Sequence, residues 1–102
     1  MEQLSRIQKR NNLNIVCVDG ETGPGGAHHD YVICDISTEE PLLQVAFQKG
    51  PRLDPQARHG VLDTDLLEIV RDRLLAFQKG EFATRENAIA LTHIEEALLW
   101  MG

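Results

Sequence analysis

The stretch LLEIVRDRLLAFQKGEFATRENAIALTHIEEALLW, residues 66–100, decides how this chain folds. Apolar residues recur in it at steps of three and four, which is the spacing of one face of an α-helix. A segment rich in Gly, Phe, Thr, Arg and Asn interrupts this pattern near its middle. The stretch therefore predicts two helices joined back to back as a hairpin.

The first predicted helix begins near Asp63 or Thr64, because both are good N-cap residues. Its apolar face is formed by Leu66, Val70, Leu74 and Phe77. Gly80 is expected to end this helix, since the left-handed position that follows a helix favours glycine.

Thr84 is expected to cap the second helix. The apolar stripe of this helix consists of Asn87, Leu91, Ile94, Leu98 and Met101. A neighbouring line of small residues, which would let another helix approach closely, consists of Ala83, Ala90 and Ala97. Two apolar surfaces on one helix suggest self-association, and packing of one surface against a sheet is the alternative explanation.

Upstream of the hairpin, three runs rich in β-branched and aromatic residues predict strands. These runs are LNIVCV at 13–18, YVICDI at 31–36 and LLQVAF at 42–47. No helical pattern separates them, which favours an antiparallel sheet. A sheet this small needs a cover, and the helices can supply it.

The expected fold is therefore α+β: a small antiparallel sheet of about three strands packed with a C-terminal antiparallel helical hairpin. We expect one domain over residues 1–102. It would comprise a sheet region at 13–48, a loop at 49–62 and the hairpin at 63–101. Residues 1–12 are polar and are expected to form a solvated arm or a short helix, with a ligand-binding arm as the alternative.

The connection DGETGPGGAHHD, residues 19–30, is too rich in glycine and proline for regular structure. Its GPGGA segment matches neither the dinucleotide-binding glycine motif nor the Walker loop, so it is a weak indication of a phosphate cradle. The same connection contains His28, His29 and Asp30, residue types that bind metals. Neighbouring side chains on an extended chain point to opposite sides, so we expect no metal site there.

The composition excludes several classes of protein. A net charge of -6 argues against binding to polymeric nucleic acid, which requires a basic surface. The sequence contains no run of eighteen apolar residues, so it predicts no membrane span. Its first residues lack the apolar core of a signal peptide. Two cysteines, Cys17 and Cys34, fit a reducing cytosol, with a disulfide between adjacent strands as the alternative.

The segment between the helices is the strongest candidate site. The first amide groups of a helix have no partner within it, and they attract phosphate. Arg85 could grip phosphate oxygens, Phe77 or Phe82 could stack on a base, and Asn87 could both donate and accept hydrogen bonds. The structural alternative makes the phenylalanines core residues, Arg85 a solvated side chain and Asn87 a cap. Glu81 and Glu86 lie nearby and would repel phosphate.

Two other cations, Arg52 and Arg58, lie in the irregular segment after the third predicted strand, where either could reach a ligand or remain solvated. The sequence suggests no serine or cysteine nucleophile paired with a histidine. Glu95 and Glu96 are successive on a helix and therefore diverge, as surface charges do.

The hairpin closely resembles that of the phage Thoeris anti-defence sponge family. The resemblance rests on FQ-x-G-x-F-A-x-R-E-N-A-x-A-L followed by EEAL-x-W, with GPGGAHHDY and VAFQKGP upstream, and it covers residues 23–101. Members of that family are not enzymes. They bind cyclic ADP-ribose signals made by bacterial TIR-domain proteins, and some also bind cyclic oligonucleotides. Related hairpins occur in phage sponges that counter the CBASS system.

The resemblance implies specific site residues. Phe77 matches the family's base-stacking phenylalanine, and Asn87 matches its ligand-binding asparagine. Arg85 lies in the same R-E-N triplet, and Arg52 corresponds to an arginine in the preceding loop. In the family, a basic segment commonly continues the second helix, whereas this sequence ends at Gly102. We therefore expect contacts from that segment to be lost or supplied by other cations.

The resemblance also implies partners and location. We expect the protein to bind a cyclic ADP-ribose isomer such as glycocyclic ADP-ribose, or a cyclic oligonucleotide, in the cytoplasm of an infected bacterium. It would do so as a homodimer, or as a trimer of dimers, with neither cofactor nor metal. Two alternatives remain open: a metal-dependent nucleotide hydrolase that uses His28, His29 and Asp30, and a module whose second helix binds a host protein.

Overall fold

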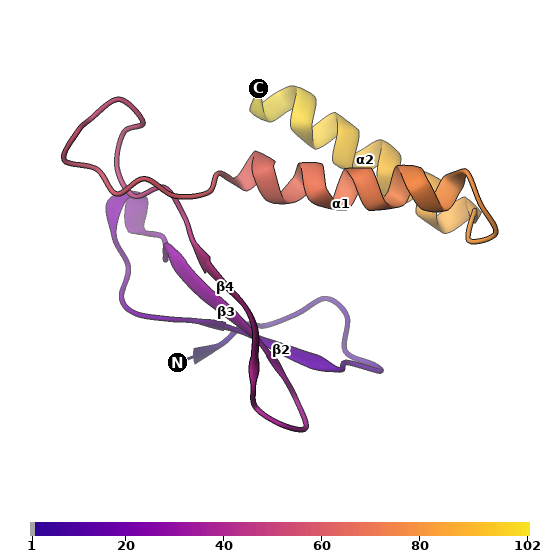
Figure 1. Ribbon diagram of the computed structural model, residues 1–102, viewed down its shortest axis with the longest axis horizontal. Helices are drawn as coiled ribbons and strands as arrows, with labels where there is room; N and C mark the ends of the chain where they lie inside the picture. The colour runs from indigo at the N-terminus through magenta and orange to yellow at the C-terminus, as the bar shows by residue number, and fades with distance from the viewer. Residues whose placement is uncertain (1) are drawn as a thin grey trace. The chain divides into compact units, whose positions relative to one another are not determined.

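A computed structural model describes residues 2–102, and it confirms the α+β fold (Figure 1). The described chain divides into two compact units at Val61 and Leu62. The first unit contains a four-stranded sheet, and the second contains the two helices. No helix in the described part of the chain is long and apolar enough to cross a membrane.

The sheet is antiparallel throughout, in the order β1-β2-β3-β4. Its strands are β1 (Glu2–Gln3), β2 (Asn14–Val18), β3 (Asp30–Asp35) and β4 (Pro41–Ala46). The three predicted strands are confirmed, and β1 is an addition. The prediction of an arm or a helix for residues 1–12 was therefore wrong for Glu2 and Gln3, which pair with Val18 and Cys17.

The core of the sheet lies on the face that carries Cys17, Val32 and Cys34, all less than 10% exposed, with Ile15 packed beside them. The register sets Cys17 opposite Val32, and Cys34 opposite Ile15. The two cysteines are thus diagonal neighbours rather than partners, and both are free thiols. They act as small apolar core residues.

The turn between β3 and β4 is built on Asp35. Its Oδ1 accepts hydrogen bonds from the Ser37 backbone N–H at 2.8 Å, the Ser37 hydroxyl at 2.7 Å and the Thr38 N–H at 3.0 Å. Because these bonds favour the charged carboxylate, they lower the pKa of Asp35, the Ser37 hydroxyl contributing most. The Asp35 side chain thereby holds the turn that sets the register of the two strands.

The glycine-rich connection between β2 and β3 is more ordered than its composition predicts. It contains a short 3₁₀ turn, η1 (Pro24–Gly26), and Thr22 forms an isolated β-bridge with His28. Gly25 and Gly26 adopt positive φ angles of 76° and 75°, which explains why glycines are needed there. The prediction of a connection without regular structure was therefore wrong at this point.

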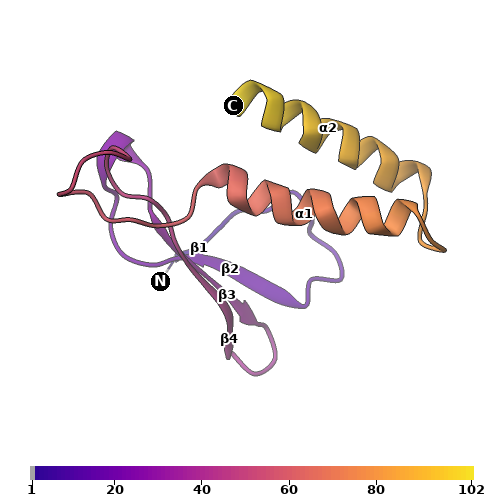
Figure 2. The same ribbon diagram turned by 45° about the horizontal axis from the view of Figure 1, so that its top comes forward.

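The second unit consists of α1 (Asp63–Gln78) and α2 (Arg85–Met101), which lie side by side as the predicted hairpin (Figure 2). Between them, Arg71 Nε donates to Glu95 Oε2 at 2.8 Å. Because this hydrogen bond favours the charged guanidinium, it raises the pKa of Arg71. The predicted stripe of α2 contains its one buried residue, Leu91, although Met101 remains 44% exposed. On α1, Val70 is 43% exposed and is not part of a buried face.

Two predictions about helix ends were wrong. The N-cap of α1 is Leu62 rather than Asp63 or Thr64, because the Asp65 carboxylate accepts a hydrogen bond from the Leu62 N–H at 2.9 Å. At the other end, the N–H groups of Lys79 and Gly80 donate to the carbonyls of Ala76 and Phe77, respectively. These i→i+3 bonds close the last turn. Gly80 therefore ends the helix without the left-handed backbone that we expected.

Candidate functional site

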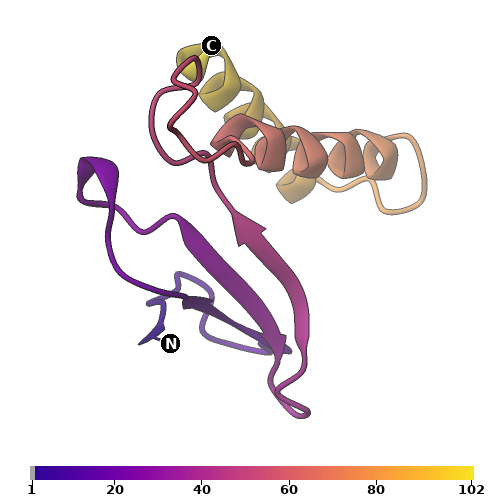
Figure 3. The same cartoon turned by 60° about the vertical axis from the view of Figure 1, so that its left-hand side comes forward.

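The candidate site is the hairpin turn, residues 77–87, which joins α1 to α2 (Figure 3). The side chain of Gln78, the last residue of α1, closes this turn. Its Nε2 donates to the Thr84 carbonyl at 3.2 Å, and its Oε1 accepts from the Thr84 N–H at the same distance. These two hydrogen bonds hold the start of α2 against the end of α1. The two ends of the intervening segment, residues 79–83, are thereby fixed relative to each other.

Thr84 caps α2 as predicted, because its hydroxyl accepts a hydrogen bond from the Asn87 N–H at 3.0 Å. The Thr84 carbonyl accepts from the Ala88 N–H, also at 3.0 Å. The hydrogen bonds of the described residues leave the amide groups of Arg85 and Glu86 without an acceptor. These two N–H groups lie at the positive end of the helix dipole, where an anion is favoured.

The Asn87 side chain fastens the turn from within. Its Nδ2 donates to the Phe82 carbonyl at 3.1 Å. A carboxamide has a second N–H and a carbonyl oxygen, and no described residue bonds to either of these in Asn87. Asn87 thus has a structural role and retains groups that can meet a ligand.

The two phenylalanines of the turn meet edge to face. Their ring centroids are 5.9 Å apart, with an interplanar angle of 85°. The Phe82 ring is 63% exposed, whereas Phe77 is partly buried. The Arg73 guanidinium lies over the Phe77 ring, 5.4 Å from its centroid. The turn therefore offers exposed aromatic surface with a cation beside it.

Three of the four predicted site residues fall within the same segment. Phe77, Arg85 and Asn87 all lie in the hairpin turn, and Arg85 is exposed. Arg52 lies in the first unit, on the loop between β4 and α1, where it is also exposed. Among the ion pairs of the described residues, neither arginine takes part.

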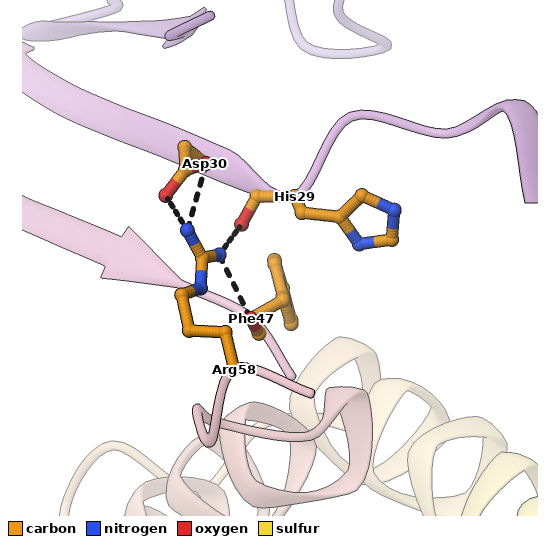
Figure 4. A network of polar contacts seen from close by, with 4 residues as sticks. All are labelled: His29, Asp30, Phe47 and Arg58. Carbon is orange, nitrogen blue, oxygen red and sulfur yellow. Dashed lines mark hydrogen bonds and ion pairs between the residues drawn. The ribbon is translucent and has the colours of Figure 1, made fainter. Parts of the chain in front are cut away.

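Arg58, unlike the exposed Arg52, has a structural role. Figure 4 shows its contacts with Asp30, His29 and Phe47. Its Nη1 lies 3.1 Å from Asp30 Oδ1 and 3.2 Å from Oδ2. Its Nη2 donates to the carbonyls of Phe47 at 2.9 Å and His29 at 3.3 Å. Arg58 thereby fastens the loop after β4 to the start of β3. Both of its Nη atoms are occupied, whereas its buried Nε has no hydrogen-bond partner among the described residues.

The same contacts count against a metal centre at His28, His29 and Asp30. The His29 ring forms a hydrogen bond with the Pro24 carbonyl at 2.9 Å, and both oxygens of Asp30 face Arg58. Within residues 2–102, no three His, Cys, Asp or Glu side chains are grouped so that they could hold a metal ion. The three residues therefore do not converge on one point.

Sequence reasoning missed two residues of the site, Arg73 and Gln78. Arg73 stands four residues before Phe77 on α1, a spacing that brings side chains together on a helix, so this neighbour was open to prediction. The bonds of Gln78 to Thr84 depend on how the turn folds, and no local spacing indicates them.

Comparison with known proteins identifies the family of the chain. Residues 39–102 match the family model described as "Acb2/Tad1, hairpin domain". A protein called "Thoeris anti-defense 1", from Bacillus phage SBSphiJ7, is 42% identical over 80 residues, which is 78% of this chain and 54% of the relative. The chain thus spans about half the length of this relative. It belongs to the Acb2/Tad1 family, and the matched region includes both helices, the hairpin turn and Arg52.

Proposed function

We propose that this protein is a phage anti-defence protein that binds a cyclic ADP-ribose-type immune signal, such as glycocyclic ADP-ribose, and holds it uncleaved. A cyclic oligonucleotide is a further expected ligand. The observation that carries the proposal is the hairpin turn, where aromatic rings, a carboxamide and free helix amides lie together. Withdrawal of the signal in the cytoplasm of the infected cell would keep the bacterial effector inactive.

Each part of the turn suits one part of such a ligand. A base can stack on Phe77 and on the exposed Phe82 ring, an interaction worth about 1–3 kcal/mol per base. A phosphate can accept hydrogen bonds from the free amides of Arg85 and Glu86, together with the Arg85 guanidinium. The unused carboxamide groups of Asn87 can meet a base edge or a ribose hydroxyl.

The charge of the chain makes local cations necessary. The net charge is -6, and the carboxylates of Glu81 and Glu86 lie in the hairpin turn itself. We assign Arg52 as a further ligand contact, since it is exposed and lies within the segment that matches the family. Arg52→Ala is expected to weaken ligand binding more than Arg58→Lys does. Lysine keeps the charge at position 58, and the Arg58 side chain already contacts Asp30, His29 and Phe47.

A protein of this kind must bind tightly rather than react. A dissociation constant near 1 nM corresponds to about -12 kcal/mol, and a ligand of a few dozen atoms reaches this only in a preformed and enclosed site. A second copy of the chain could provide the enclosure. Large apolar side chains support such assembly, because Ile69, Leu99 and Trp100 of the hairpin are 60%, 82% and 88% exposed.

We therefore propose a homodimer, or a trimer of dimers, as the binding form. Light scattering measures the mass of the particle, and Trp100→Glu is the variant that tests the apolar surface. A charged side chain at an interface that excludes water would reduce the mass toward that of one chain. A wild-type particle with the mass of one chain would contradict the proposed assembly.

Calorimetry with glycocyclic ADP-ribose and a panel of cyclic oligonucleotides tests ligand binding. Phe77→Leu preserves an apolar side chain but removes the aromatic face, whereas Phe77→Tyr retains a ring. We expect about a tenfold or greater loss of affinity for the leucine variant and near wild-type affinity for the tyrosine variant. Equal affinities for the two variants would exclude base stacking on Phe77.

A further inference from the structure

Arg73 differs from its neighbour Arg71 in how its charge is compensated. Arg71 Nε lies 2.8 Å from Glu95 Oε2, and its Nη1 lies 3.8 Å from Glu68 Oε1. The ion pairs of the described residues include none for Arg73. The described contact of the Arg73 guanidinium is with the Phe77 ring. One arginine of α1 therefore joins the helices, and the other carries an uncompensated charge beside the aromatic pair.

The sequence explains why Arg73 has no acidic partner on its own helix. Side chains three and four residues apart are neighbours on a helix surface, whereas adjacent residues do not face one another. The residues at these distances from Arg73 are Ile69, Val70, Ala76 and Phe77, and none of them is acidic. Asp72 is adjacent in sequence, a spacing at which helix side chains do not face one another, and it forms no ion pair with Arg73. An aromatic ring thus holds Arg73 while its charge remains available.

A guanidinium on an aromatic ring keeps its ability to bind anions. The Arg73 Cζ lies 5.4 Å from the Phe77 centroid, within the range of a cation–π contact, and such a contact uses none of the five N–H donors of the guanidinium. The donors can therefore form a paired contact with two phosphate oxygens while the ring contact persists. Held in this way, the side chain loses less conformational entropy on binding than a free arginine would.

We propose that Arg73 binds a phosphate group of the nucleotide whose base stacks in the hairpin turn, and that it selects phosphorylated ligands over uncharged nucleosides. This inference rests on the proposed function. The proposal adds a specificity-determining residue on α1, before the hairpin turn. Arg85 lies on the other side of this turn, at the start of α2. The ligand class that it favours is a nucleotide with a phosphate close to a base.

Calorimetry with a cyclic ADP-ribose isomer tests the role of Arg73. Arg73→Gln removes the charge, and Arg73→Lys keeps it but lacks the planar fork. We expect the glutamine variant to bind about tenfold or more weakly, since a hydrogen bond to a charged group is lost. The lysine variant should lie between glutamine and wild type. As a matched control, Arg10→Gln removes an exposed cation of the first unit and should leave the affinity unchanged.

Two further measurements separate phosphate binding from a structural role. The affinity of the wild type should fall with rising salt concentration, and this dependence should be weaker in Arg73→Gln. The thermal unfolding midpoint should fall by no more than a few degrees, because the residue is exposed and loses only its contact with the Phe77 ring. Wild-type affinity and salt dependence in Arg73→Gln, with binding lost in Phe77→Leu, would overturn the role of Arg73 alone. A wild-type protein that binds no cyclic nucleotide would overturn the proposed function as well.

Discussion

The Nδ2 of Asn87 donates a hydrogen bond to the carbonyl oxygen of Phe82 across the hairpin turn, at 3.1 Å. This bond spans five residues and ties the first turn of α2 to the backbone that carries the exposed ring. Asn87 therefore holds the backbone that carries an aromatic side chain, while its remaining polar groups have no partner among the described residues. Its substitution is expected to affect both folding and ligand binding.

The variants Asn87→Ala and Asn87→Asp separate these two roles. Alanine removes the hydrogen bond to Phe82, and we expect unfolding free energy to fall by about 0.5–1.5 kcal/mol. Aspartate cannot donate this bond either, but its charge is favourable in the first turn of a helix, so it should be less destabilising. A carboxylate would also repel a phosphate, so calorimetry should show weak ligand binding for both variants. Wild-type affinity in Asn87→Asp would contradict a ligand contact at this position.

Gly60 is required by the close approach of two backbone segments. A Cβ placed on it would lie 2.5 Å from the Ala46 carbonyl oxygen and 2.6 Å from the Phe47 carbonyl carbon. Gly60→Ala therefore forces the backbone apart and should cost about 1–3 kcal/mol. Urea denaturation followed by circular dichroism measures this loss.

Gly80→Ala is the matched control for Gly60→Ala. A Cβ on Gly80 has nothing within 4 Å, and the backbone there is not left-handed. Alanine reduces the conformational freedom of the unfolded chain, so this variant should be neutral or slightly more stable. Equal destabilisation of the two variants would show that the contact at Gly60 is not the cause.

Arg58 is expected to control the order of the loop between β4 and α1. Its guanidinium contacts Asp30, Phe47 and His29, and its backbone pairs with Lys49 in both directions. Arg58→Ala removes the side-chain contacts and should accelerate amide hydrogen exchange over residues 48–61. Arg58→Lys should give an intermediate rate, because an ammonium cannot match the planar donor fork. Unchanged exchange in the alanine variant would exclude this role.

The lowered pKa of Asp35 predicts a specific dependence of stability on acid. Because its pKa is lower in the folded than in the unfolded chain, its stabilising contribution is complete above the unfolded pKa of about 3.9. The contribution is lost as the pH falls through the folded value. Asp35→Asn removes this titration, so the stability difference between the two proteins should shrink below about pH 4. A difference that is constant with pH would contradict the cause assigned to the shift.

The sequence predicted much of the fold because its strongest pattern is local. Periodic apolar residues and the Thr84 cap sufficed for the hairpin, and β-branched runs sufficed for three strands. Strand β1 escaped prediction because Glu2 and Gln3 are polar and are paired only through the backbone of β2. Helix α1 begins at Asp63, as expected, but its N-cap is Leu62. The Asp65 carboxylate accepts a hydrogen bond from the Leu62 N–H, a choice that several nearby acidic residues left open.

The candidate site was less predictable because its groups are arranged by contacts outside any periodic pattern. Phe77, Arg85 and Asn87 could be expected to lie in one segment, since a single short turn contains them. The ring pair, the Gln78–Thr84 bonds and the occupied state of Arg58 depend on tertiary geometry. An exposed Arg52 and an occupied Arg58 look equivalent in sequence, and only the fold distinguishes them.

The central claim is that the protein retains its ligand chemically intact, and the fate of that ligand tests it most directly. Glycocyclic ADP-ribose, in slight molar excess over the protein, is incubated with it. The mixture is passed over a desalting column, and the protein fraction is then heat-denatured. Mass spectrometry should find the unchanged cyclic compound in the released material, in stoichiometric amount. A linear or cleaved product would contradict the account, and so would a protein fraction that carries no nucleotide.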